Sequence, residues 1–172
     1  MRRLVAILFG LLTGASASAS PPLATVQHVD LSRYAGTWYE IAAFPKWFQR
    51  GCVATQATYA LRSDGGVEVL NSCRDQRLDG KERRAKGKAW IVDRTSNAKL
   101  KVQFFWPFRG DYWIVALDPD YRWSVVGDPT RTSCWILSRS RHLDDETLAA
   151  IFDRVRALGF DPARLVRTVQ PD

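Results

Sequence analysis

The sequence predicts an all-β fold: an eight-stranded antiparallel up-and-down barrel with one C-terminal α-helix packed outside it. Short segments whose apolar residues alternate at period two, separated by turn residues, recur over residues 36–139. The apolar period then changes to steps of three and four residues over 144–159, which is typical of an amphipathic helix. Closing an antiparallel sheet removes its edges, and eight strands leave an interior that can hold one small ligand. A β-sandwich built from the same strands is the structural alternative.

The first residues have the composition of a secretory signal peptide. Arg2 and Arg3 precede an apolar run over residues 4–12, and a tract of small residues contains the cleavage motif Ala17-Ser18-Ala19. The apolar run is too short to span a bilayer. We therefore expect residues 1–19 to be removed and residues 20–172 to form a single exported domain.

The barrel strands are expected in regular succession after a glycine bend at Gly36, which opens the first of them. The other seven are expected at residues 55–62, 67–73, 86–93, 99–106, 111–117, 121–127 and 133–139. The alternation is clearest from Lys99 to Trp106, where one face must be buried and the other wet. Apolar residues fill most of 111–117, as expected of a strand covered on both faces.

The segment after the strands predicts one helix of about four turns. Asp144 suits the N-cap, and Gly159 stands where a C-terminal cap belongs. Leu148, Ile151 and Val155 form an apolar stripe that must lie against another surface, and the outer face of the doubly covered strands is the natural place. Residues 165–169 are expected to add a short strand to the sheet.

The chain contains three cysteines, Cys52, Cys73 and Cys134. Export favours disulfide formation, and Cys52 and Cys73 lie nearly equidistant from the turn at residues 63–66. Cys52 is at an even position and Cys73 at an odd one, and the apolar residues of that hairpin lie at odd positions. If the alternation were uninterrupted, the two cysteines would lie on opposite faces, so a bulge or register shift must intervene if they are bonded. Cys134 is then expected to remain a buried free thiol.

Two segments resemble the lipocalin family. One is the opening of the first strand, Gly36-Thr37-Trp38-Tyr39-Glu40, and the other is Trp135-Ile136-Leu137-Ser138-Arg139 at the end of the last barrel strand. The chain is most similar to bacterial lipocalins and apolipoprotein D, and the resemblance covers nearly all of it after the leader. It implies that Gly36, Trp38 and Arg139 close the base of the barrel, with the guanidinium on the indole face.

The sequence offers little for catalysis. Neither His28 nor His142 has a second ligand at metal-binding spacing, so no metal site is expected. No nucleophile elbow or phosphate-binding loop is present, so neither a catalytic residue nor a cofactor is expected. The alternative is an enzyme of the same fold acting through Cys134, which would need a neighbouring base or cation.

An apolar container remains as the expected function. Its walls are expected to include Trp90, Val102, Phe104, Trp106, Tyr112, Trp123 and Ile136, although strands that are apolar on both faces leave the inward choice ambiguous. The loop over residues 44–51 adds Phe44, Trp47 and Phe48, with Lys46 or Arg50 expected to meet a carboxylate or phosphate head. The resemblance implies binding and storage or transport of a fatty acid or lysophospholipid.

The formal charge of +7 is dispersed along the chain. Its densest basic run, residues 81–88, is expected to be a solvated loop or strand edge, with peripheral contact with an anionic membrane surface as the alternative. Nucleic acid is not an expected partner, because no aromatic residue interrupts that run.

The expected location follows from the leader. Bacterial lipocalins are often acylated on a cysteine after the leader, whereas the first cysteine here is Cys52, so we expect a soluble periplasmic protein, with association with the outer membrane left open. A filled barrel whose surface binds a partner protein, or a second copy as a homodimer, is the remaining functional alternative.

Overall fold

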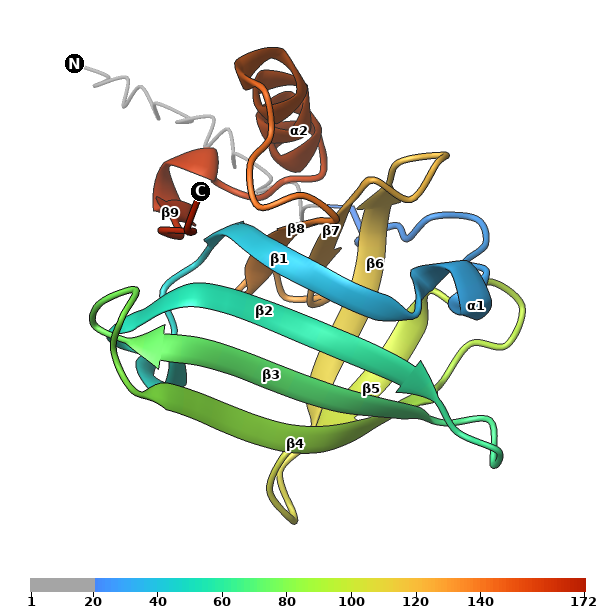
Figure 1. Ribbon diagram of the computed structural model, residues 1–172. Helices are drawn as coiled ribbons and strands as arrows, with labels where there is room; N and C mark the ends of the chain where they lie inside the picture. The colour runs from blue at the N-terminus through green and yellow to red at the C-terminus, as the bar shows by residue number, and fades with distance from the viewer. Residues whose placement is uncertain (1–20) are drawn as a thin grey trace, which may run out of the picture.

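A computed structural model describes residues 21–172, and Figure 1 shows its strands wrapped into a barrel with the helix α2 outside. The expected leader, residues 1–19, lies outside the described residues. The barrel strands are β1 (Gly36–Ala43), β2 (Cys52–Leu61), β3 (Val67–Asp75), β4 (Glu82–Ile91), β5 (Lys99–Gln103), β6 (Gly110–Leu117), β7 (Trp123–Gly127) and β8 (Cys134–Ser138). Each pairs with its neighbours in antiparallel fashion, and β1 joins both β8 and β2, which closes the barrel. The predicted eight-stranded architecture is confirmed.

The C-terminal helix α2 (Asp145–Ala157) begins and ends as the sequence predicts. The Asp144 carboxylate accepts a hydrogen bond of 2.7 Å from the Thr147 backbone N–H, which caps the first turn. Leu148, Ile151 and Val155 are buried in a cluster formed with the outward faces of β1, β6, β7 and β8. In Figure 1, α2 accordingly lies outside the barrel wall, beside β7 and β8.

Several boundaries differ from the prediction. β4 begins at Glu82, so most of the basic run lies in a strand. β5 ends at Gln103, and the chain turns over residues 104–109 before β6. β7 begins only at Trp123, because Tyr121 adopts a left-handed backbone conformation with φ of +61°. In each case the turn geometry, which alternation does not encode, decides where pairing starts or stops.

Three one-turn helices were not predicted: α1 (Leu31–Tyr34) and the 3-10 turns η1 (Trp47–Gln49) and η2 (Pro162–Arg164). A single turn is too short to produce a helical period in the sequence. The short strand β9 (Val166–Arg167) pairs with the end of β1. It lies within the segment 165–169 where a short strand was expected.

The disulfide between Cys52 and Cys73 is confirmed, with the two Cα atoms 5.5 Å apart. The register of β2 against β3 shifts between Val53 and Gln56, and Ala54 has a φ of +50°. This irregularity resolves the parity difference noted in the sequence, because the extra residue turns Cys52 back toward its partner. Cys134 is a buried free thiol, as predicted.

The closed end of the barrel is tied together by Arg139. Its guanidinium carbon lies 3.9 Å from the centre of the Trp38 ring. Its Nη atoms donate to the backbone carbonyls of Arg33 at 2.7 Å, Thr37 at 2.8 Å and Ala35 at 2.9 Å. These carbonyls lie at the end of α1 and the start of β1, so one cation fixes α1 to the barrel wall.

Gly36 stands beside this guanidinium and has a φ of +96°, a conformation that side chains rarely adopt. A Cβ atom there would approach Arg139 Nη1 to 3.3 Å. The glycine that the sequence places before the first strand therefore allows both the bend and the close approach of the arginine.

Candidate functional site

A cavity of about 860 Å³ occupies the barrel interior. This volume lies within the range of pockets that bind small molecules. The cavity is lined mainly by residues of β2 to β6, with Glu40 of β1 and with Trp135 and Leu137 of β8, and two loops border its mouth, residues 44–51 and 104–109. Its far end is plugged by α1. The filled-barrel alternative therefore does not describe this interior.

The interior is hollow because the inward face of β4 carries only small residues near its middle. Ala85, Gly87 and Ala89 alternate along this face, and Ala85 and Ala89 line the cavity. A Cβ atom on Gly87 would come within 2.7 Å of the Phe104 ring, so the glycine leaves room for that aromatic side chain. On β2, Ala57 likewise faces the cavity. The small size of these wall residues creates the space.

Three tyrosines form a polar cluster at the deep end of the cavity. The hydroxyl of Tyr112 lies 3.0 Å from that of Tyr34 and 2.9 Å from that of Tyr59, and Tyr34 also contacts the Ser124 hydroxyl at 3.1 Å. Burial raises the pKa of Tyr34 to about 12, and burial also raises the pKa values of Tyr59 and Tyr112. The phenols are therefore neutral at physiological pH and satisfy one another, so this end of the cavity carries no charge.

A buried carboxylate stands on the cavity wall. The two oxygens of Glu40 accept hydrogen bonds from the Thr168 hydroxyl at 2.6 Å and from Gln49 Nε2 at 2.7 Å, and Gln49 accepts from Trp135 Nε1 at 3.2 Å. Burial raises the pKa of Glu40 above its usual range, because these neutral donors only partly compensate for lost hydration. The chain of contacts joins β1, η1, β8 and the C-terminal segment. Sequence reasoning missed it, although a glutamate between apolar strand residues was a visible signal.

Basic side chains gather at the mouth end: Lys46, Arg83, Arg84 and Arg109 line the cavity. Lys46 donates a hydrogen bond of 3.0 Å to the Thr132 carbonyl, and its Nζ lies 5.8 Å from the centre of the Trp135 ring. Arg109 lies 5.0 Å from the centre of the Trp90 ring. Neither cation forms an ion pair within residues 21–172, so both can meet an anionic group.

Arg83 holds the mouth loop on the barrel. It donates hydrogen bonds to the backbone carbonyls of Phe48 at 3.2 Å and Arg50 at 3.0 Å, and it lies 3.4 Å from the Asp75 carboxylate. Arg50 therefore contributes its carbonyl, and its side chain does not line the cavity. The expectation that Arg50 faces a ligand head is corrected, because Arg50 is exposed and is not among the residues that line the cavity.

The structure brings six of the predicted ligand-contacting residues together around the cavity: Lys46, Trp47, Phe48, Val102, Phe104 and Tyr112. They come from η1 and its N-cap, from β5 and the residue after it, and from β6. Sequence reasoning missed the small residues of β4 and the tyrosines Tyr34 and Tyr59. Trp135 was noted only in the family motif, and it also lines the cavity.

Five other predicted wall residues lie outside the cavity. Phe44 and Ile136 are buried in the outer cluster beneath α2, and Trp123 packs against it. β7 and β8 are apolar on both faces, because α2 covers one face and the barrel interior lies against the other. The alternation of apolar residues along these strands therefore could not identify the inward side. The inward residues there are Val126 and Leu137, which belong to the inner cluster.

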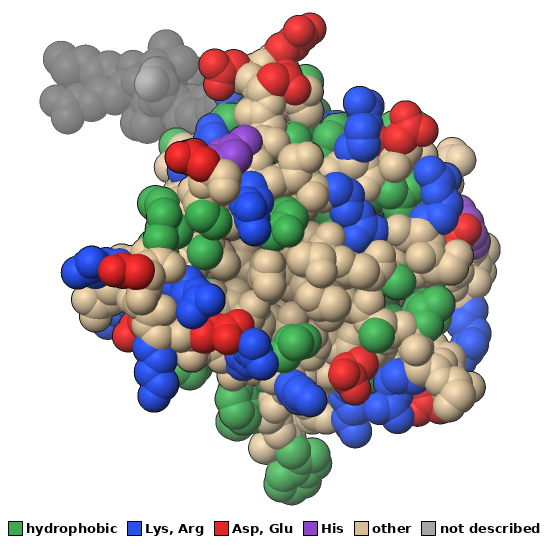
Figure 2. All heavy atoms as spheres, in the orientation of Figure 1, with side chains coloured by type: hydrophobic (Ala, Val, Ile, Leu, Met, Phe, Trp, Pro, Cys, Tyr) green, Lys and Arg blue, Asp and Glu red, His purple; other side chains and the backbone are tan. Residues whose placement is uncertain are grey.

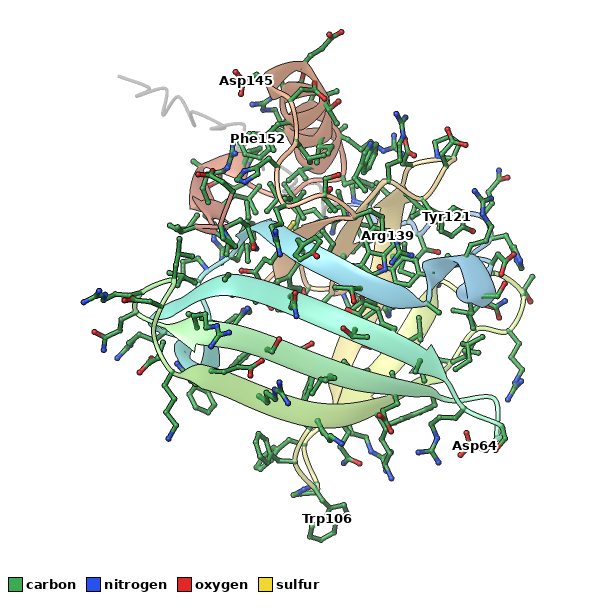
Figure 3. All side chains as sticks on the ribbon, in the orientation of Figure 1. Asp64, Trp106, Tyr121, Arg139, Asp145 and Phe152 are labelled. Carbon is green, nitrogen blue, oxygen red and sulfur yellow. A yellow bond between two sulfur atoms is a disulfide. The ribbon has the colours of Figure 1, made fainter. Side chains whose placement is uncertain are left out.

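The remaining two corrections have different causes. Trp90 faces outward beneath Arg109, while its neighbour Ala89 lines the cavity. Trp106 lies in the turn after β5, where the alternation has already ended, and it is largely exposed. Figure 3 shows it at the tip of the β5–β6 loop, pointing away from the barrel.

Cys134 does not line the cavity. It is fully buried in the outer cluster, and burial, together with nearby Asp128, raises the pKa of its thiol to about 12. A thiolate is therefore strongly disfavoured at neutral pH. This geometry gives no support to the alternative of an enzyme acting through Cys134.

The described part of the chain lacks two further features. Residues 21–172 contain no group of three or more His, Cys, Asp or Glu side chains placed to hold a metal ion. Within the same residues, no helix has the length and apolar character needed to cross a membrane.

Comparison with known proteins gives one consistent result. Residues 29–170 match the family model of the lipocalin-like domain. The chain is 40% identical over 162 residues to the outer membrane lipoprotein Blc of Escherichia coli, covering 93% of this chain and 91% of that protein. It is 34% identical over 159 residues to apolipoprotein D of Macaca fascicularis, covering 88% and 81%. Insecticyanin of the tobacco hornworm superimposes with a TM-score of 0.71 at 22% identity, covering 90% and 87%.

Proposed function

The chain belongs to the lipocalin family, and from this premise we propose that it binds a fatty acid or lysophospholipid inside the barrel and stores or carries it in the cell envelope. The observation that carries the proposal is the cavity of about 860 Å³, which runs from a basic, aromatic mouth to a neutral deep end. A long apolar chain with one anionic end complements this distribution of charge.

The expected orientation places the ligand head at the mouth. Lys46 and Arg109 are the cations there without a carboxylate partner among residues 21–172. The three phenols at the deep end are engaged with one another, so a charged head placed there would lose its hydration without a counter-charge. The acyl chain therefore lies along Val102 and Phe104.

The expected affinity is moderate. Each buried methylene contributes about 0.8 kcal/mol, so a long acyl chain offers roughly 10 kcal/mol before costs. Ordering the chain and losing its translational freedom offset several kcal/mol of this. Dissociation constants in the micromolar to sub-micromolar range suit a protein that must both hold and release its ligand.

The place of action in this proposal is the cell envelope. The relatives from Escherichia coli, Citrobacter freundii and Vibrio cholerae are named outer membrane lipoproteins. The first cysteine of the sequence is Cys52, and we propose that the protein acts in the same envelope, in a soluble periplasmic form. This location is tested by expressing the full chain and measuring how much of the protein is found in the periplasmic fraction and how much in the membrane fraction.

A pair of matched substitutions tests the container. Ala85→Trp places an indole in the cavity, whereas Lys86→Trp places one on the opposite, exposed face of the same strand. We expect Ala85→Trp to weaken binding of a long-chain fatty acid about ten-fold or more, which corresponds to about 1.4 kcal/mol, and Lys86→Trp to leave it unchanged. Equal affinity of both variants would place the ligand outside the barrel.

Native mass spectrometry of the protein purified from its host identifies the ligand class. The expected result is a bound mass that matches a fatty acid or lysophospholipid and is lost in Ala85→Trp. An empty protein that also fails to bind such lipids in titration would reject the proposal.

A further inference from the structure

We propose that the mouth of the barrel docks onto an anionic phospholipid bilayer through an aromatic rim made of Trp47, Phe48, Phe105, Trp106 and Phe108. This goes beyond ligand binding, since it assigns a second surface and a second partner to the molecule. The docking itself requires no particular ligand in the cavity.

The aromatic rim consists of large side chains left in water. The exposed fractions are 82% for Trp47, 49% for Phe48, 73% for Phe105, 84% for Trp106 and 77% for Phe108. They come from two loops that are far apart in sequence, yet four of the five line the same cavity mouth. Figure 2 shows the β5–β6 loop as an apolar protrusion at the lower end of the molecule. Monomeric soluble proteins seldom keep such a patch unless it contacts a partner.

The chemistry of the rim suits the interface of a bilayer. Tryptophan is enriched at the level of lipid headgroups, where its ring meets the acyl boundary and its N–H remains hydrated. Trp47 and Phe48 pack edge to face with ring centres 5.7 Å apart, which gives η1 a firm apolar surface. Because both loops border the same cavity, their exposed rings can enter the headgroup layer together.

The charges around the rim select an anionic surface. Lys46, Arg50 and Arg109 stand on or beside the two loops and form no ion pair within the described chain. Of the acidic groups that line the cavity or flank the rim, Asp75 lies against Arg83 and Asp111 against Lys101, whereas Asp128 accepts hydrogen bonds from Thr130 and Thr132 and keeps its charge, so the cations outnumber it. The rim is therefore positive overall, and each of its cations is attracted to a negatively charged leaflet.

The same charges argue against a second copy of the chain as the occupant. A symmetric dimer through the rim would bring the unpaired cations of one copy against those of the other. A bilayer offers phosphate groups to the cations and an apolar layer to the rings at once. Docking in this orientation also turns the cavity mouth toward the lipid, so an acyl chain can enter or leave without crossing bulk water.

Co-sedimentation with vesicles tests the proposal. The full chain is mixed with vesicles of phosphatidylcholine alone or of an equimolar mixture with phosphatidylglycerol. We expect wild type to bind the anionic vesicles and to dissociate from them as salt is raised. Trp106→Ser/Phe108→Ser should weaken this binding about ten-fold or more. The control Val92→Ser/Val166→Ser removes two exposed apolar side chains elsewhere and should bind like wild type.

A charge variant separates the two contributions. Lys46→Gln/Arg109→Gln should lose most of the preference for anionic over neutral vesicles while the rings remain in place. Wild type that fails to bind anionic vesicles, or a rim variant that binds as well as wild type, would overturn the proposal. A rim-dependent dimer in analytical ultracentrifugation, without vesicle binding, would assign the surface to a second copy instead.

Failure of the membrane-docking proposal can be distinguished from failure of the proposed ligand binding. Fatty-acid titration of the single variant Trp106→Ser in vesicle-free solution should give an affinity within two-fold of wild type, because Trp106 is exposed and does not line the cavity. Vesicle binding without fatty-acid binding would reject only the container, and the converse would reject only the docking surface.

Discussion

At the scale of single residues, the base of the barrel depends on Arg139. One guanidinium covers the Trp38 ring and donates hydrogen bonds to four backbone carbonyls near the closed end, those of Arg33, Tyr34, Ala35 and Thr37. We expect Arg139→Ala to lower the free energy of unfolding by about 2–4 kcal/mol, because buried acceptors lose charged donors and the indole loses its cover. Ligand preference should not change, because the guanidinium lies outside the chain-binding part of the cavity.

Arg141→Ala is the matched control for this prediction. Arg141 also places a guanidinium over an aromatic ring, that of Tyr39 at 5.3 Å, but it is exposed. Its removal should change stability by less than about 1 kcal/mol. Urea unfolding of the two variants, with fatty-acid titration of each, decides the point. A changed ligand profile with unaltered stability in Arg139→Ala would contradict the structural role.

Glu40 makes stability depend on pH in a defined direction. The pKa of its carboxyl group is raised in the folded state by burial, so the folded protein binds this proton more tightly than the unfolded chain. Glu40 therefore favours folding when protonated, and this contribution is lost as pH rises through the raised folded-state pKa. Gln at this position can accept from Gln49 and donate to the Thr168 hydroxyl, which keeps both contacts without a charge.

We accordingly expect Glu40→Gln to be more stable than wild type at neutral pH, by about 1–3 kcal/mol, and to lose part of the pH dependence. Thermal unfolding from acid to neutral pH measures both effects. Glu68→Gln, which changes an exposed carboxylate on β3, should behave like wild type. Parallel pH profiles for wild type and Glu40→Gln would show that burial does not perturb this group.

At the scale of elements, α2 stabilises the barrel from outside and does not shape the cavity. Ile151 is fully buried between the helix and the sheet. Ile151→Ala should cost about 2–5 kcal/mol of stability, because it leaves a void that the packed cluster cannot fill. Fatty-acid affinity should stay within two-fold of wild type below the unfolding transition.

The control on the same helix is Arg154→Ala, whose side chain is exposed and whose replacement favours helix formation. Its stability should match or slightly exceed that of wild type in calorimetry. A loss of fatty-acid affinity in folded Ile151→Ala would mean that the outer cluster is coupled to the cavity wall.

At the scale of the whole molecule, two apolar clusters share one sheet. The outer cluster is filled by α2, whereas the inner one surrounds a space that a ligand can occupy. A bound fatty acid should therefore stabilise the protein, by about 2.7 kcal/mol at a free concentration one hundred times the dissociation constant. At the same fatty-acid concentration, calorimetry should show this full shift in wild type and in Lys86→Trp, and about half of it or less in Ala85→Trp. A shift of equal size in all three would indicate binding at another place.

Much of this molecule was determined by the sequence itself. Alternation and turn residues specified the antiparallel strands, the change of period specified α2, and the motif around Trp38 together with Arg139 identified the family. These features are local, because the side chain's direction follows from its position along a strand or helix. The pairing of Cys52 with Cys73 also followed from distance to one turn, once a bulge was allowed.

Only the tertiary structure decided which face of each strand became the cavity wall. Trp123 and Ile136 lie on strands that are apolar on both sides, so their inward face depended on where α2 docked. Trp106 was predicted to line the wall but is exposed, because β5 ends at Gln103 and the residues after it form a turn that does not pair with a neighbouring strand. The hollow itself arises from Ala85, Gly87 and Ala89, whose small size matters only because they face the same interior. Alternation in the sequence indicates that one face of a strand is apolar. The curvature and closure of the sheet and the position of α2 decide what that face contacts.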